Sequence, residues 1–110
     1  MADGVFLAWS SPVSPDQLAQ FDQWYSSTHI PQVRAAVPSI SAVARYELID
    51  PAGAGPSYRY LTVYELDDAD IPAAVAAMNE SAAVGKIDMS PAMDLVQRPP
   101  VAEWYRAYPS

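Results

Sequence analysis

Cysteine is absent from this chain, and histidine occurs once, at His29. The first absence excludes disulfides, thiolate metal sites, iron–sulfur clusters and a cysteine nucleophile. The second excludes any site that needs two imidazoles from one chain. The four glycines never form the GxGxxG pattern of a dinucleotide-binding loop, and no EF-hand or Walker spacing occurs. The available chemistry therefore rests on histidine, tyrosine, tryptophan, serine, arginine and carboxylates.

Positive charge is also scarce. Six Lys and Arg residues stand against thirteen Asp and Glu residues, which gives a net charge of −7. The bases are scattered, so no patch favours nucleic acid or an anionic membrane surface. No apolar run approaches the roughly 18 residues of a membrane-spanning helix, and residues 1–4 lack the basic residues of a secretory leader. We expect a cytoplasmic protein that binds neither nucleic acid nor membrane.

The chain contains enough apolar side chain for one domain over residues 1–110, because 51% of its residues are hydrophobic. Alternating or continuous apolar runs predict four strands, at residues 5–10, 41–49, 58–66 and 101–108. A first helix begins with Ser14 as its N-cap and Pro15 at its first position. Pro31 disfavours the helical conformation at the residue before it, so this helix is expected to end near His29. A second, alanine-rich helix runs from Pro72 to Gly85.

The predicted order is β-α-β-β-α-β, which is typical of the ferredoxin-like fold. In that α+β fold an antiparallel four-stranded sheet carries both helices on one face. The third strand is apolar on both sides, so either Leu61 and Val63 or the tyrosine side of the strand can lie under the helices. The other side of the sheet would expose apolar side chains. We therefore expect two copies to stack their sheets as a homodimer.

The segment from Trp24 to Pro31 carries the clearest chemical signal. Tyr25 and His29 are four residues apart, so they share one face of a helix and can touch. At a helix end, unpaired carbonyls favour the protonated imidazole. An imidazole beside a phenol can act as an acid/base pair on a bound ligand. The ordinary alternative is that His29 caps the helix C-terminus with its ring half in water.

These residues resemble a known family. The runs FDQWYSSTHIPQVRAAVPSISAVARYEL, YRYLTVYEL and DMSPAMD are similar to the dimeric α/β-barrel superfamily, and above all to its EthD-like branch. Members of that branch usually carry a run like FNxWYxxxHxP…PGFxSAxRY. The chain departs from it at Ser39 and Ile40, where the family has glycine and an aromatic residue. The resemblance implies a ferredoxin-like domain that dimerises through its sheets, with a pocket that needs neither cofactor nor metal.

The resemblance also places His29 at the position of the histidine that serves as acid/base in cyclase- and isomerase-like members. We expect a small enzyme that acts on an aromatic or polyketide-like molecule as a cyclase, isomerase or lyase. In this reaction His29 would be the acid/base and Tyr25 would assist it. Three alternatives remain open. They are a cofactor-independent monooxygenase, a non-catalytic protein that holds a small molecule, and, more remotely, a haem-degrading enzyme.

Further side chains are expected to contact the ligand: Trp24, Arg45, Tyr46, Tyr60, Tyr64 and Met89. For the aromatic residues the commoner use is packing in the core or the dimer interface, and for Met89 it is filling the edge of the core rather than closing over a pocket. Arg45 could bind a substrate carboxylate, or form a cross-strand ion pair. Asp22 is expected to be a solvated helix residue.

Overall fold

The computed structural model describes residues 2–68 and 70–109. Its four strands are β1 (Gly4–Ser10), β2 (Ile40–Glu47), β3 (Tyr60–Leu66) and β4 (Val101–Arg106). Its helical segments are η1 (Pro15–Gln17), α1 (Leu18–Trp24), η2 (Tyr25–His29), α2 (Ile30–Ala36) and α3 (Ile71–Ala83). The segments η1 to α2 follow one another without a break, so the order of elements is the predicted one.

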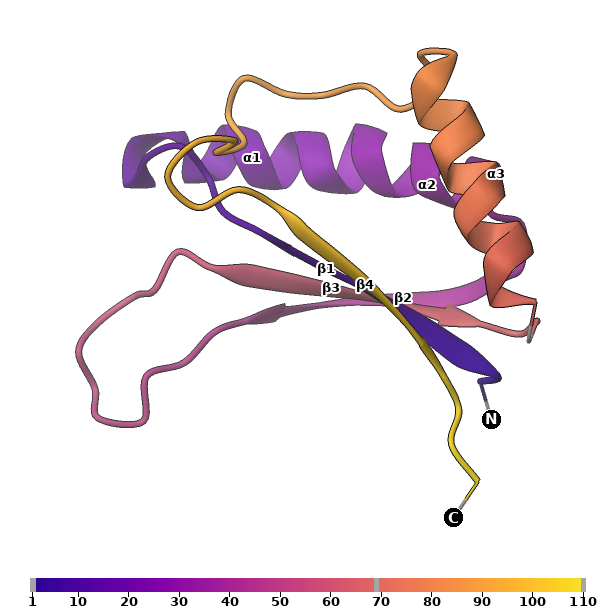
Figure 1. Ribbon diagram of the computed structural model, residues 1–110. Coiled ribbons are helices and arrows are strands. Elements are labelled where there is room, and N and C mark those ends of the chain that lie inside the picture. Colours follow the sequence, from indigo (N-terminus) through magenta and orange to yellow (C-terminus); the bar gives the residue numbers. More distant parts are fainter. Residues whose placement is uncertain (1, 69, 110) are drawn as a thin grey trace.

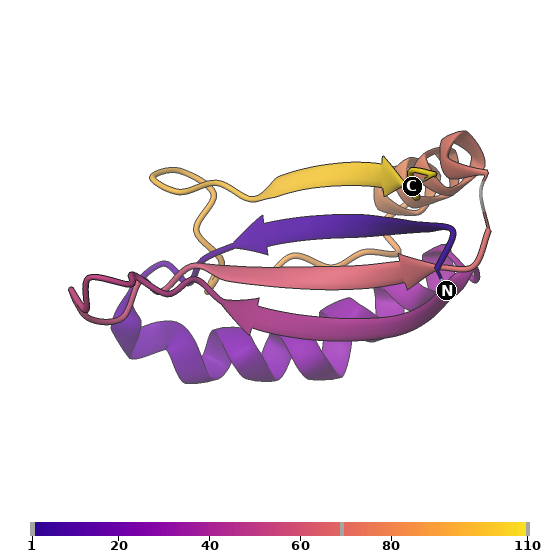
Figure 2. The same ribbon diagram turned by 90° about the horizontal axis from the view of Figure 1, so that it is seen from below.

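The strands form one sheet in the order β2-β3-β1-β4, and every neighbouring pair is antiparallel. The helices all lie above this sheet in Figure 1, and the opposite face, turned toward the viewer in Figure 2, has no helix over it. This strand order, with the helices on one face of the sheet, is the ferredoxin-like arrangement. The predicted α+β fold is therefore confirmed for the single chain.

The first long helix does not end at His29, so that prediction was wrong. Residues 25–29 form a π-helical turn, and α2 continues to Ala36. The Ile30 N–H donates to the carbonyl of Tyr25, five residues back. A π turn widens the helix just before Pro31, where an α-helix would press a carbonyl against the proline ring. The chain therefore passes through the proline within one continuous helix.

The π turn also sets which side of the helix faces the sheet. Phe21 and Tyr25 are buried, and so are Val33 and Val37 further along. At about 100° per residue, an unbroken α-helix would carry Val33 about 120° around the axis from Phe21. The extra residue of the π turn removes most of that rotation. Both pairs of apolar side chains therefore pack on the sheet.

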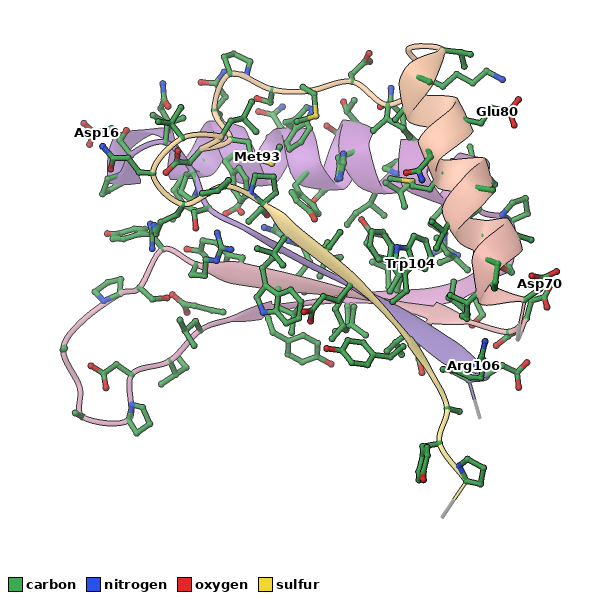
Figure 3. The ribbon with its side chains drawn as sticks, viewed as in Figure 1. Asp16, Asp70, Glu80, Met93, Trp104 and Arg106 are labelled. Carbon is green, nitrogen blue, oxygen red and sulfur yellow. The ribbon has the colours of Figure 1, made fainter. Side chains whose placement is uncertain are left out.

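The tyrosine side of β3 is the side that lies under the helices. Tyr64 and Leu66 are fully buried. The Phe6 ring stacks between Tyr64 and Trp104, with centroid distances of 5.2 and 4.1 Å, and Figure 3 shows Trp104 reaching from β4 toward the helices. Burying each of these side chains contributes about 1.5–3 kcal/mol. Because side chains alternate along a strand, Leu61, between Tyr60 and Thr62, lies on the open face.

Helix α3 covers the β1–β4 side of the sheet. The carboxylate of Asp70 caps it by accepting the Ala73 N–H at 3.1 Å, and the helix ends before Gly85 as predicted. Gly4 lies beneath this helix, where an added Cβ would come within 2.6 Å of the Tyr105 carbonyl oxygen. Glycine is therefore required at that crossing. Among the described helices, none combines the length and the apolar character needed to cross a membrane.

Candidate active site

A cavity of about 270 Å³ lies between the sheet and the helical layer. Its walls come from β1, the start of β4, α3, the π turn and the segment that follows α3. Most of the lining is apolar and includes Phe6 from β1 and Met78 from α3. Three lining side chains carry a hydroxyl or imidazole group, namely Ser10, Tyr25 and His29. An apolar cavity with a few convergent polar groups is the usual form of a small-molecule site.

His29 lies in the middle of the long helix, against two aromatic rings. Its ring centroid is 4.8 Å from that of Trp24 and 4.8 Å from that of Tyr25, the latter in an edge-on contact. Burial lowers the pKa of His29 from 6.5 to about 4. The expected protonated ring at a helix end is therefore wrong, because the helix continues past it and desolvation decides the charge. The Nδ1 atom is shielded from solvent and has no hydrogen-bond partner in the described chain.

Tyr25 forms the link between His29 and the interior of the protein. Its side chain is 1% exposed and contacts the ring of Phe21 at a centroid distance of 5.6 Å. The guanidinium carbon of Arg45 lies 4.5 Å from the centre of the Tyr25 ring on the sheet side. Cation–π and edge-on aromatic contacts of this kind hold a ring in one orientation. Tyr25 is thus fixed where it can touch both the imidazole and the cavity.

Arg45 does not line the cavity. It pairs with Asp22 on α1 at 3.1 Å and also lies over the rings of Phe21 and Tyr60, 5.7 Å from each centroid. The ion pair of Arg45 is therefore formed with Asp22 on a helix and not with a carboxylate on a neighbouring strand. Because this pair lies behind Tyr25, Arg45 acts here on the tyrosine ring and not on the cavity.

The other aromatic residues expected at the site, Trp24, Tyr60 and Tyr64, pack against it without lining the cavity. Trp24 packs on His29, while Tyr60 and Tyr64 lie on β3 beneath the long helix. Burial, together with the neighbouring Tyr25, raises the pKa of the Tyr64 hydroxyl far above its ordinary value. Tyr64 is therefore a neutral phenol at physiological pH. The cavity lining includes none of these three side chains.

The segment after α3 closes one end of the cavity. Met89 and Met93 from this segment line it, and Figure 3 shows Met93 between this segment and the long helix. The segment is tied down by a backbone bond of 2.7 Å from Val13 to the carbonyl of Ala92. Ala92 itself is fully buried. Met89 therefore belongs to a fixed wall, although its side chain is 54% exposed.

Two arginines fasten this wall to the β2–β3 hairpin. Arg98 donates to the carbonyl of Ser57 at 2.7 Å, and Arg59 donates to the carbonyl of Pro99 at 3.3 Å. Each arginine thus binds the backbone of the segment that carries the other. Asp94 completes the loop by accepting three backbone N–H groups at 2.9–3.0 Å. These backbone bonds hold the pKa of the Asp94 carboxyl below its usual range.

The sequence matches no protein-family model and no curated protein at a significant level. Solved structures do resemble it. An EthD-like protein from Ralstonia eutropha JMP134 superposes with a TM-score of 0.55 at 14% identity, covering 94% of this chain and 91% of that one. An ethyl tert-butyl ether D (EthD) family protein from Bacillus halodurans C-125 gives 0.51 at 18% identity, covering 96% and 99%. A candidate monooxygenase from Shewanella loihica PV-4 gives 0.52 at 15% identity, covering 100% and 99%.

The chain shares the fold of the EthD-like proteins. At these identities the likeness concerns the fold and leaves the chemistry to be argued from the side chains. Among the residues that the structure describes, no group of three or more histidines and carboxylates could hold a metal ion.

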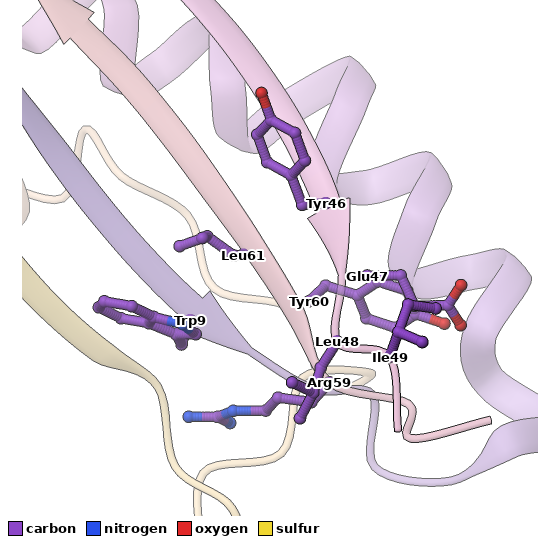
Figure 4. Close-up of a pocket in the computed structure, with 8 residues that line it drawn as sticks. All are labelled: Trp9, Tyr46, Glu47, Leu48, Ile49, Arg59, Tyr60 and Leu61. Atoms are coloured by element: carbon purple, nitrogen blue, oxygen red, sulfur yellow. The ribbon is translucent and has the colours of Figure 1, made fainter. Parts of the chain in front are cut away.

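Within this EthD-like fold, Tyr46 lies on the wrong side of the sheet for the cavity. Arg45 and Tyr46 are consecutive on β2, so their side chains point to opposite faces and cannot both meet one ligand. Tyr46 is 55% exposed and lines a separate hollow of about 400 Å³ on the open face, with Trp9 and Leu61. Figure 4 shows these three side chains around that hollow. The expectation that Tyr46 shares a site with His29 is therefore corrected.

Ser10 is the cavity residue that the sequence analysis missed. It is 3% exposed and ends β1, on the same side of the strand as Phe6 and Ala8. The available signal was the alternation of the strand, which puts a hydroxyl in line with two apolar residues of the helix-facing side. That signal was weak because a serine at a strand end usually belongs to the turn that follows.

Proposed function

We propose that this protein is a cofactor-independent enzyme that moves a proton on an aromatic or polyketide-like small molecule, as cyclases, isomerases and lyases do. The observation that carries the proposal is the state of His29. The one imidazole of the chain is neutral, lines an apolar cavity and keeps an unpartnered Nδ1 in the described structure. A neutral imidazole accepts a proton, and a desolvated site strengthens its interaction with a developing charge.

The proposed step needs no external reagent. His29 takes a proton from a carbon or hydroxyl of the ligand, and the electron pair left behind moves onto a conjugated oxygen. Tyr25, whose ring contacts the imidazole at 4.8 Å, assists by holding it in place and by donating its hydroxyl to that oxygen. The imidazolium then returns the proton at another atom of the ligand. Protons and electrons balance within one turnover.

The first test is hydrogen–deuterium exchange on 2-tetralone, a two-ring ketone with acidic protons beside its carbonyl. In D₂O the wild-type protein is expected to speed deuterium uptake at these carbons above the buffer rate, as followed by mass spectrometry. Replacing His29 by Gln should slow the protein-dependent rate by roughly a hundredfold or more, the ordinary contribution of a general acid/base. Thr28→Ala is the neighbouring control, since Thr28 does not line the cavity, and it should exchange at the wild-type rate.

Two results would count against the proposal. Equal exchange rates in His29→Gln and wild type would remove His29 from the reaction. Binding of 2-tetralone by the wild type without any exchange above buffer would favour a protein that holds a metabolite without converting it. Ligand-induced thermal stabilisation distinguishes that binding from no interaction.

A cofactor-independent monooxygenase is the second candidate. Its support is the candidate monooxygenase from Shewanella loihica PV-4, which shares this fold over the full chain. Such an enzyme needs an electron-rich phenolic ligand that itself reduces O₂, so consumption of O₂ with a phenolic compound would separate it from proton transfer. Exchange on 2-tetralone without O₂ uptake supports the first candidate.

We also propose that the enzyme works as a homodimer. The open face of the sheet, which Figure 2 shows uncovered, carries apolar side chains such as Val63, Trp9 and Tyr105. Tyr105 is 48% exposed, and its hydroxyl donates to Glu103 on the same strand at 2.7 Å. A second copy related by a two-fold axis would bury this face against the same face of its partner.

A further inference from the structure

The hydroxyl of Ser10 is one of several buried polar groups that lack a partner in the described chain. Its Oγ is shielded from solvent and has no hydrogen-bond partner among residues 2–68 and 70–109. Other buried serines nearby are satisfied, since Ser11 Oγ accepts from Arg59 at 3.2 Å and Ser90 Oγ accepts from Ala92 N–H at 3.1 Å. Burying a hydroxyl without a partner costs about 1–3 kcal/mol. A buried hydroxyl is usually bonded to the protein, to an ordered water or to a ligand.

The unpartnered hydroxyl lies in the lining of the same cavity as His29. Ser10 comes from the sheet and His29 from the helix, so the two groups approach the cavity from its two layers. Each carries one hydrogen-bonding atom, Ser10 Oγ and His29 Nδ1, that the described chain leaves without a partner. The rest of the lining is almost wholly apolar. A ligand of this cavity would therefore be mainly apolar, with polar atoms placed to meet Ser10 and His29 beside the Tyr25 hydroxyl.

Charge restricts the ligand further. No Lys or Arg is among the described residues that line the cavity. Two arginines close to the lining are already engaged: Arg45 pairs with Asp22 at 3.1 Å. Arg59 donates to the Ser11 hydroxyl at 3.2 Å and to the carbonyl of Pro99 at 3.3 Å. A carboxylate or phosphate would lose its hydration in this cavity without gaining a cation. An uncharged ligand meets no such penalty.

Size gives the remaining limit. The cavity, at about 270 Å³, is near the lower end of small-molecule pockets, which run from roughly 300 to 1,000 Å³. A molecule of one or two fused rings is small enough for a cavity of this volume.

We infer that Ser10 is a ligand-binding residue, and that the cavity takes an uncharged aromatic molecule of one or two rings whose oxygen hydrogen-bonds to the Ser10 hydroxyl. The inference names the substrate class for the proposed function and rests on it for the identity of the site. It concerns binding alone, so it can be tested without turnover. It also disfavours carboxylates and other anions as substrates.

Three probes of one shape test it at pH 7: naphthalene, 2-naphthol and 2-naphthoate. They differ by a hydroxyl and by a carboxylate, and NMR titration gives a dissociation constant for each. The wild type should bind 2-naphthol roughly three- to tenfold more tightly than naphthalene, as one neutral hydrogen bond allows, and 2-naphthoate most weakly. Ser10→Ala should bring the 2-naphthol and naphthalene constants together, whereas Ser10→Thr, which keeps the hydroxyl, should retain the preference.

A serine on another strand provides the matched control. Ser41 on β2 bonds to Asp67 at 3.0 Å and lies outside the cavity, so Ser41→Ala should keep the wild-type preference. Because the preference is a ratio within one variant, a general loss of stability does not create or remove it.

The inference is overturned if Ser10→Ala keeps the full preference for 2-naphthol, if 2-naphthoate binds most tightly, or if none of the probes binds the wild type. These outcomes differ from failure of the proposed function. Normal deuterium exchange in His29→Gln would reject proton transfer by His29 and leave the role of Ser10 in binding intact. Loss of the 2-naphthol preference in Ser10→Ala would support the binding role whatever the exchange rate.

Discussion

The imidazole of His29 is neutral at physiological pH because it lies against Trp24 and Tyr25 instead of water. Neutral histidine has one nitrogen that donates and one that accepts a hydrogen bond. Burial keeps the ring neutral and makes its protonation costly. This residue therefore couples the chemistry of the site to the stability of the fold.

The protein is expected to lose stability as the pH falls from 7 to 4. The unfolded chain takes up a proton at His29 near pH 6.5, while the folded chain does so only near pH 4. The unfolded state thus binds more protons in this window, and the free energy of unfolding falls by about 3 kcal/mol across it. Urea denaturation at several pH values measures this fall.

The variant His29→Gln isolates the contribution of this one group. Glutamine does not titrate, so the variant should lose about 3 kcal/mol less than the wild type over the same range of pH. An NMR titration of the single imidazole in the wild type gives its pKa directly. A value near 6.5 with parallel stability curves for the two proteins would contradict the buried, neutral ring.

At the scale of elements, the segment from Val84 to Pro100 has no regular secondary structure, yet it is held firmly. Its backbone bonds to the β1–α1 connection, and two arginines join it to the β2–β3 hairpin. Tyr58 in that hairpin has a φ of 53°, a left-handed conformation that costs a non-glycine residue some strain. Its carbonyl accepts from Arg98 at 3.3 Å, a contact that helps to maintain the conformation.

Replacing Asp94 by Ala should loosen this segment without unfolding the sheet. The carboxylate accepts the N–H groups of Val96, Gln97 and Arg98, and alanine offers no acceptor. Hydrogen exchange at these three amides is expected to rise several-fold, while amides of β1 and β3 keep their protection. Asp94→Asn retains one carbonyl oxygen and should give an intermediate rate. Unchanged exchange in Asp94→Ala would show that the segment is held by the arginines alone.

The sequence patterns were sufficient for the elements and their order, because strand alternation, proline positions and the glycine after α3 are local signals. They failed where contacts between residues far apart in the sequence decide the local structure. The proline rule ended the first helix at His29, but packing of Val33 and Val37 on the sheet favours a π turn over a break. Arg45 and Tyr46 were both assigned to a ligand because residue type was weighed without the alternation of β2. The serine cap predicted at Ser14 also makes no side-chain bond.

At the scale of the whole molecule, one side of the sheet is a packed core and the other is an apolar surface. The fold leaves Leu7, Val63 and Leu61 on the side without helices. In a monomer this apolar surface would remain in contact with water, and the free-energy cost grows with the apolar area exposed. The charge of −7 per chain opposes random association, so a specific two-fold pairing of the sheets is the expected outcome.

A lysine in the centre of the open face should convert the proposed dimer to a monomer. Val63→Lys places a charge where two sheets would meet, whereas Val84→Lys makes the same change at the end of α3, where the side chain is 62% exposed. Native mass spectrometry should give the mass of two chains for the wild type and Val84→Lys, and of one chain for Val63→Lys. A wild type that is monomeric at micromolar concentration would contradict the homodimer.

The π turn between Trp24 and Ile30 also affects how this chain can be compared with others. A relative that spans the same distance with α-helix alone has one residue fewer there. Correct alignment then requires a one-residue gap inside a helix, where gap penalties are usually most severe. Without the gap, every position from His29 onward in that helix is paired with a residue from a different face. Profiles built for such relatives would score His29 against the wrong column.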